Sequence, residues 1–151
     1  MKTSPENAHL GFRRVLVAVD GSPNATRAAR VAVTLAKKYE AELYVLHVIR
    51  QPPYLLPSES LEHYYRDTKK AAEKWVNEVA SLADSQGLKV KRMILEHAPS
   101  VVQFISDYAA KNEVDLIVVG TRGLSGFKKL MIGSTSAGTV THAPCHILVV
   151  R

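Results

Sequence analysis

The stretch VLVAVDGSP, residues 15–23, decides how this chain folds. Residues 15–20 form a nearly continuous apolar run rich in valine, which is typical of a strand buried on both faces of a parallel sheet. The run stops at Asp20, after which Ser22 is a good helix N-cap and Pro23 suits the first helical turn. The stretch therefore predicts a buried strand that passes directly into a helix.

Strands and helices alternate along the rest of the chain. The apolar patterns predict further strands at 42–49, 88–96, 115–120 and 145–150, and helices at 23–39, 59–86, from Pro99 onward and at 134–142. The strand at 88–96 alternates apolar with basic residues, which is typical of an edge or one-sided strand. This order predicts an α/β fold with a doubly wound, five-stranded parallel sheet and helices on both faces.

Length and composition indicate one globular domain. The chain has 151 residues, of which 46% are hydrophobic, and no apolar run approaches the roughly 18 residues needed to cross a bilayer. We expect residues 1–12 to form a flexible arm and residues 13–151 a single domain. Because the sequence has one cysteine, Cys145, it has no intramolecular disulfide, and a cytoplasmic location is the simplest expectation.

The formal net charge of +6 favours anionic partners. The basic residues are nevertheless scattered, no block reaches five like charges, and the aromatic residues (7%) do not interleave with them. We therefore expect neither a nucleic acid nor a membrane partner.

A glycine-rich stretch, GTRGLSGFKKLMIGSTS at residues 120–136, follows the fourth predicted strand. Gly120 and Gly123 would let the backbone turn tightly and approach a ligand. Gly133 precedes three hydroxyl residues that open a helix, whose free N–H groups favour an anion, and two lysines, Lys128 and Lys129, raise the local positive potential. The alternative is that the glycines only make a turn and that Ser134 is an ordinary N-cap.

The end of the first strand offers a second group of polar residues. Ligands of open α/β sheets bind beyond the carboxyl ends of the strands, where the strand order reverses. If the first and fourth strands are neighbours, Asp20 faces the glycine-rich stretch and could accept hydrogen bonds from a ribose or a base. Equally, Asp20 and Ser22 could merely cap the first helix.

The spacing Gly120-x2-Gly123-x9-Gly133-Ser134 resembles the G-x2-G-x9-G-[S/T] pattern of ATP-binding universal stress proteins. Four flanking stretches are similar to that family as well: VLVAVDGS at 15–22, LHVI at 46–49, DLIVVGTRG at 115–123 and HAPCHILVVR at 142–151. The chain departs from the family where His146 replaces a frequent proline, and where no glycine stands shortly before Pro99.

The resemblance implies a Rossmann-like sheet of order 3-2-1-4-5 that binds ATP across the ends of strands 1 and 4. A divalent ion, Mg²⁺, would bridge phosphate oxygens, and two copies would pair through the last strand, Ile147 to Val150. The residues implied to bind ATP are Ala18, Val19, Asp20, Leu43 or its neighbours, Val119, Gly120, Arg122, Gly123, Gly133, Ser134, Thr135 and Ser136.

The sequence favours nucleotide binding over turnover. The glycine-rich stretch lacks the P-loop lysine, and no glutamate or glutamine is placed to orient a water molecule. We expect a nucleotide-dependent switch or partner-binding module in the stress response; the alternative is a slow ATP hydrolase, or a binder of AMP or a cyclic nucleotide. A nucleophile pair of Cys145 and His146 is not expected, because adjacent strand residues point to opposite faces, and His47 is expected to be structural.

Overall fold

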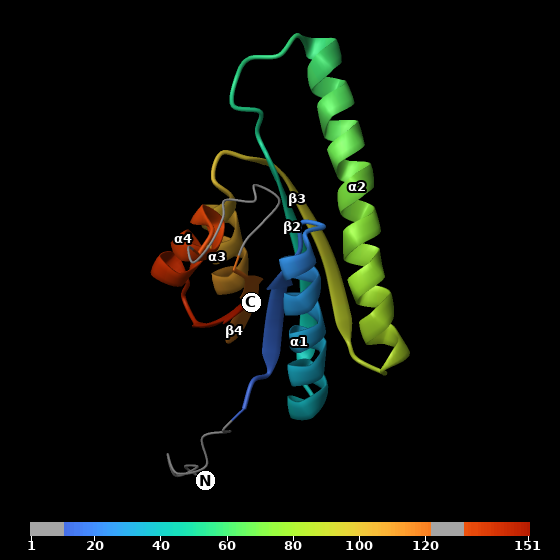
Figure 1. The fold of residues 1–151 in the computed structure, drawn as a ribbon, viewed down its shortest axis with the longest axis vertical. Coiled ribbons are helices and arrows are strands. Elements are labelled where there is room, and N and C mark those ends of the chain that lie inside the picture. Colours follow the sequence, from blue (N-terminus) through green and yellow to red (C-terminus); the bar gives the residue numbers. More distant parts are fainter. Residues whose placement is uncertain (1–10, 122–131) are drawn as a thin grey trace.

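The fold is a five-stranded parallel sheet of order β3-β2-β1-β4-β5, which confirms the predicted architecture and strand order. The computed structural model describes residues 11–121 and 132–151, and Figure 1 shows their arrangement. The strands are β1 (Arg14–Ala18), β2 (Glu42–Arg50), β3 (Val90–Ala98), β4 (Leu116–Gly120) and β5 (His146–Val150). The helices are α1 (Pro23–Tyr39), α2 (Ser58–Ser85), α3 (Val101–Lys111) and α4 (Ser134–His142).

Helix α1 begins as the sequence predicts. The Ser22 hydroxyl oxygen accepts a hydrogen bond from the Ala25 N–H at 3.1 Å, and Pro23 occupies the first turn. The side of α1 that faces the sheet is made of small residues, including Ala28, Ala32 and Ala36, which are fully buried. Small side chains let the helix approach the strands closely, so α1 holds the end of β1 in a fixed place.

The two faces of the sheet carry separate apolar cores because successive strand residues point to opposite faces. Val15 and Val17 belong to the core under α1 and α2, whereas Leu16 belongs to the core under α3. Helix α4 packs on α3. The N-terminal ends of both helices, with their polar N–H groups, stand at the carboxyl edge of the sheet. This edge is the place where the sequence predicts a ligand site.

Several predicted boundaries move at this edge: β1 ends at Ala18 and not at residue 20, β2 ends at Arg50 and not at residue 49, and two larger changes concern β3 and α3. Strand β3 continues to Ala98 because a bulge between Val48 and Arg50 extends its pairing with β2, and His97 there adopts φ 59°, a left-handed conformation that glycine adopts more easily. Helix α3 begins at Val101 and not at Pro99, because the Ser100 hydroxyl accepts a hydrogen bond from the Gln103 N–H at 3.2 Å and so caps the helix one residue after the proline.

Candidate functional site

A pocket of about 410 Å³ lies beyond the carboxyl ends of β1, β2 and β4, with further walls from α3 and the first turn of α4. It stands at the point where the strand order reverses, since β1 has β2 on one side and β4 on the other. The predicted site residues that line it are Ala18, Val19, Asp20, Val119, Gly120, Gly133, Ser134, Thr135 and Ser136.

Three predicted residues are not among this lining. Arg122 and Gly123, together with Lys128 and Lys129, lie outside the described residues. Leu43 is fully buried in the core under α1 and α2, and it pairs with Val15 at the start of β1.

Leu43 itself therefore does not line this pocket, and the expectation for strand β2 rests on the neighbours of Leu43. Leu43 lies on the opposite face of the sheet from the pocket and close to the opposite end of β2. The residues of β2 that reach the pocket are Leu46, His47, Val48 and Arg50. A strand that is apolar along most of its length does not reveal from sequence alone which end meets a ligand.

Gly120 has a structural role that the sequence does not reveal. A Cβ atom built on it would lie 2.8 Å from the carbonyl carbon of Asn24 and 2.9 Å from its oxygen. Glycine is thus required here because β4 ends against the first turn of α1. The same closeness brings the Gly120 backbone next to the turn after β1.

The first turn of α4 faces the pocket without a side-chain cap from the described residues. Its N-cap is Gly133, whose N–H donates to the Thr121 carbonyl at 2.6 Å, so Ser134 is the first helical residue and not the cap. The first N–H groups of an α-helix have no partner inside the helix. The pocket therefore meets a helix end that favours an anion.

The three hydroxyl residues of this turn are not equivalent. Ser134 and Thr135 are exposed, whereas Ser136 is buried and its hydroxyl donates a hydrogen bond to the Gly120 carbonyl. Since a serine hydroxyl has a single hydrogen, the side chain of Ser136 ties α4 to β4 and has no donor left for a ligand. Only its backbone N–H remains a candidate for that role.

Asp20 combines the two roles that the sequence leaves open. Its Oδ1 accepts a hydrogen bond from the Ser22 N–H at 2.9 Å, which shapes the turn into α1. Within the described part of the chain, its Oδ2 makes no hydrogen bond. The half-buried carboxylate thus keeps one oxygen that can accept hydrogen bonds from a ligand in the pocket.

His47 fixes the end of β1 from the neighbouring strand. Its Nδ1–H donates to the Val19 carbonyl oxygen at 2.6 Å, and its ring packs edge-on against Trp75 with 5.3 Å between ring centroids. Burial lowers the pKa of His47, and this outweighs the hydrogen bond to Val19 and the charge of Asp20, which raise it. The structural role predicted for His47 fits these contacts.

Sequence reasoning missed the apolar wall that β2 and α3 contribute to the pocket. Leu46 and Val48 on β2 and Val101 and Ile105 on α3 make this wall apolar, and Arg50 stands where β2 ends. The signal in the sequence was the LHVIR segment, whose register against the end of β1 becomes known only with the strand pairing. The pocket therefore has an apolar end at β2 and α3 and an anion-attracting end at α4.

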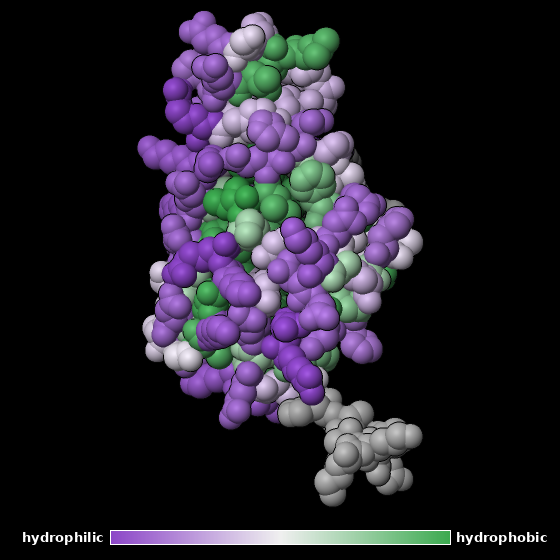
Figure 2. Space-filling view, turned by 180° about the vertical axis from the view of Figure 1, so that it is seen from behind, coloured by the Kyte–Doolittle hydropathy of each residue, from purple (hydrophilic) through white to green (hydrophobic). Residues whose placement is uncertain are grey.

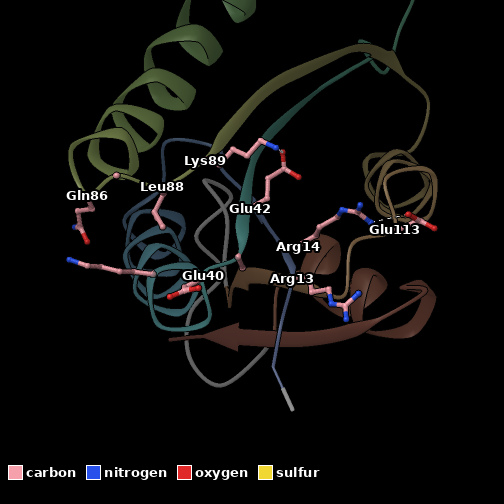
Figure 3. A pocket seen from close by; sticks show the side chains of 11 residues that line it. Arg13, Arg14, Glu40, Glu42, Gln86, Leu88, Lys89 and Glu113 are labelled. Atoms are coloured by element: carbon pink, nitrogen blue, oxygen red, sulfur yellow. Dashed lines mark hydrogen bonds and ion pairs between the residues drawn. The ribbon is translucent and has the colours of Figure 1, made fainter. Parts of the chain in front are cut away.

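A second hollow, of about 690 Å³, lies at the amino-terminal edge of the sheet (Figure 3). Four of its charged side chains form two ion pairs. Arg14 donates to Glu113 at 2.9 Å, and Lys89 lies 3.7 Å from Glu42. Open α/β sheets bind ligands at the opposite edge, so we assign the candidate site to the smaller pocket.

Other reactive or membrane-related features do not stand out in the described chain. Residues 11–121 and 132–151 contain no group of three His, Cys, Asp or Glu side chains placed to hold a metal ion. Among the same residues, no helix is long and apolar enough to span a membrane. Burial and the charge of Asp115 raise the pKa of Cys145, and together they outweigh the backbone hydrogen bond to Ile117, which lowers it, so this half-buried side chain stays a thiol.

Comparison with known proteins settles the family. A model of the universal stress protein family matches residues 11–151. The chain belongs to the universal stress protein family. Universal stress protein MJ0531 of Methanocaldococcus jannaschii is 31% identical over 142 residues, which cover 93% of this chain and 82% of the relative. The solved structure of universal stress protein UspA from Lactobacillus plantarum is 32% identical, with a TM-score of 0.75 over 93% of this chain and 99% of that one.

Three more distant solved structures contain nucleotides. A universal stress protein in complex with cAMP is 22% identical (TM-score 0.70; 93% and 98% of the two chains), and one from Archaeoglobus fulgidus in complex with dAMP is 19% identical (TM-score 0.71; 93% and 98%). An Arabidopsis thaliana member with AMP bound is 19% identical (TM-score 0.67; 91% and 90%). At these identities the likeness shows a shared fold alone.

Proposed function

We propose that this universal stress protein binds an adenine nucleotide, ATP in the first place, in the pocket beyond β1, β2 and β4. The observation that carries the proposal is that the two ends of this pocket differ in chemistry. One end is the first turn of α4 without a side-chain cap, and the other end is an apolar wall. The cAMP, dAMP and AMP bound by three relatives support an adenine ligand.

The two ends of the pocket suggest how a nucleotide lies in it. The phosphates face the backbone N–H groups of Ser134 and Thr135, where the helix dipole favours negative charge. The base packs on the apolar wall, against Leu46 and Ile105. Because β1 lies between β2 and β4, Asp20 stands between these ends, and its Oδ2 accepts hydrogen bonds from the ribose.

We propose Mg²⁺ as the companion ion. The described residues offer no cluster of three carboxylate, histidine or cysteine ligands. Magnesium commonly binds through substrate phosphates, water and one or two carboxylates, so a site of this kind suits it. When bound, the ion neutralises phosphate charge, while the chain itself holds the phosphates through Ser134 and Thr135.

The protein acts as a nucleotide-dependent switch or partner-binding module in the cytoplasm, and not as a dedicated enzyme. Phosphoryl transfer needs groups that position the attacking nucleophile and neutralise charge. Asp20 is the only carboxylate among the described residues that line the pocket, and we assign its free oxygen, Oδ2, to the ribose. Slow hydrolysis of bound ATP is the second candidate, and it follows from the same site.

We also propose a homodimer through Ile147 to Val150. Strand β5 pairs with β4 on one side and ends the sheet on the other. An open edge strand rich in valine invites pairing with another chain, and a two-fold contact would close it. Light scattering of the full chain should give twice the monomer mass of 16.6 kDa, and a monomer at micromolar concentration would contradict the proposal.

Substitution of Thr135 tests the nucleotide site without weakening the helix. Thr135→Glu places a carboxylate in the first turn of α4. There it interacts favourably with the helix dipole but repels phosphate. We expect the ATP affinity measured by calorimetry to fall about tenfold or more, the effect of roughly 1.4 kcal/mol of repulsion. Thr141→Glu adds the same charge at the exposed far end of α4 and serves as the control. Equal losses in both variants would contradict this placement of the phosphates.

A further inference from the structure

Arg50 stands at the rim of the pocket, where the sequence predicted no ligand-binding residue. It is the last residue of β2, its side chain is exposed, and it lines the pocket beside the apolar wall formed by Leu46, Val48, Val101 and Ile105. Its position makes it a neighbour of whatever group packs on that wall.

The backbone of Arg50 is held firmly in place. The Tyr64 hydroxyl donates a hydrogen bond to the Arg50 carbonyl oxygen at 2.9 Å. Arg50 also pairs with Ala98 after the bulge, and the Gln51 N–H donates to the Ala98 carbonyl at 2.9 Å. These contacts do not involve the Arg50 side chain, so the fold fixes its origin without committing its guanidinium group.

The guanidinium group of Arg50 makes no hydrogen bond or ion pair with residues 11–121 or 132–151. Some other arginines of this protein are paired; for example, Arg92 donates to Asp84 at 2.7 Å. The wall next to Arg50 is aliphatic, and His47 is the only ring among the described residues that line the pocket. The described pocket therefore offers an aromatic base no phenylalanine, tyrosine or tryptophan to stack on.

We propose that Arg50 is the base-stacking residue of this site. The proposal rests on the proposed function, which puts the base of the nucleotide on the wall formed by β2 and α3. A guanidinium group is planar, stays charged and is weakly hydrated, and for these reasons it stacks well on aromatic faces. Arg50 covers the face of the base that is turned away from Leu46 and Ile105, and it thereby favours ligands with an aromatic base over base-free phosphates.

Calorimetry with ATP and AMP on the full chain tests this role. Arg50→Met keeps a long side chain but removes the guanidinium group, and we expect it to weaken ATP and AMP binding by the same factor, about three- to tenfold. Arg13→Met removes the same charge at the opposite edge of the sheet, where Arg13 is exposed, and should leave both affinities unchanged. The unfolding midpoint of Arg50→Met should match that of the original protein, because the anchoring contacts are made by the backbone.

The outcomes separate the two proposals. If the original protein binds neither ATP nor AMP, the proposed function fails and the role of Arg50 fails with it. If both bind and Arg50→Met binds them equally well, only the role of Arg50 is overturned. It is also overturned if the loss grows from AMP to ATP, since the guanidinium would then act on the phosphates and not on the base.

Discussion

Gly120 is the residue at which the fold and the candidate site depend on each other most closely. An alanine Cβ at this position would lie 2.8 Å from the carbonyl carbon of Asn24 and 2.9 Å from both its oxygen and its Cβ. Real Cβ atoms do not come this close to backbone, so Gly120→Ala must push the first turn of α1 away from β4. Relief by a side-chain rotation is not available, because two of the three atoms belong to the Asn24 backbone.

The free-energy cost of Gly120→Ala follows from the overlap between the added Cβ and Asn24. Forcing one extra carbon into a packed place costs about 1–3 kcal/mol. For a chain of this length, each kcal/mol lowers the melting temperature by roughly 2–4 °C, so we expect Gly120→Ala to melt about 2–12 °C lower. Thermal unfolding followed by circular dichroism measures this shift, and the fluorescence of Trp75, the single tryptophan, reports the region near the end of β1.

A second variant sharpens the test. Truncating the Asn24 side chain removes no backbone atom, so adding Asn24→Ala to Gly120→Ala should not restore stability. If Gly120 were needed solely for the approach of a ligand, the apoprotein would keep its melting temperature and lose only nucleotide affinity. An unshifted Gly120→Ala melting curve would therefore refute the packing account of this glycine.

Three further predictions concern single side chains. Because burial lowers the pKa of His47, the unfolded state takes up a proton first, and the free energy of unfolding should fall as the pH drops from about 6.5 toward the folded pKa. Urea unfolding between pH 7.5 and 5.5 should show a smaller fall of this free energy in His47→Gln than in the original protein, and an identical fall would count against the prediction. Burial raises the pKa of Glu42, but the Tyr44 hydrogen bond and nearby lysines outweigh this and leave the pKa lowered. Glu42→Gln should thus destabilise the protein at pH 7 and have a smaller effect once acid protonates Glu42, whereas an equal loss of unfolding free energy at pH 3 would exclude this linkage. Exposed Glu40 ends α1 with φ 54°, so Glu40→Gly should raise the unfolding free energy by about 1 kcal/mol, and a lower melting temperature would disprove strain there.

The architecture could be predicted from the sequence because each element carries its own local signal. The valine-rich run before Asp20, the Ser22 cap and the alanine face of α1 require no knowledge of distant residues, and all agree with the structure. The strand order came from the family resemblance, and the structure confirms it. Local patterns alone would have left the positions of β2 and β4 relative to β1 open.

The candidate site was less predictable because it depends on how distant segments meet. Leu43 lies away from the pocket, and an apolar strand does not show in its sequence which of its residues line such a pocket. The packing role of Gly120 depends on Asn24, which is far away in sequence. Likewise, the use of the Ser136 hydroxyl by the Gly120 carbonyl is a contact across 16 residues, and no sequence pattern distinguishes it from a free phosphate donor.

The connection between β2 and α2 is apolar in part. It carries two exposed apolar side chains, Tyr54 and Leu55. Figure 2 shows apolar side chains at the end of the molecule where this connection lies in Figure 1.

Direct titration of the purified protein with ATP and Mg²⁺ by calorimetry tests the central claim, after any copurified nucleotide has been removed and identified by mass spectrometry. The account predicts one nucleotide per chain, and weaker binding in Thr135→Glu than in the Thr141→Glu control. Absence of any adenine nucleotide in the purified protein, together with no heat on titration with ATP, AMP or cAMP, would contradict it.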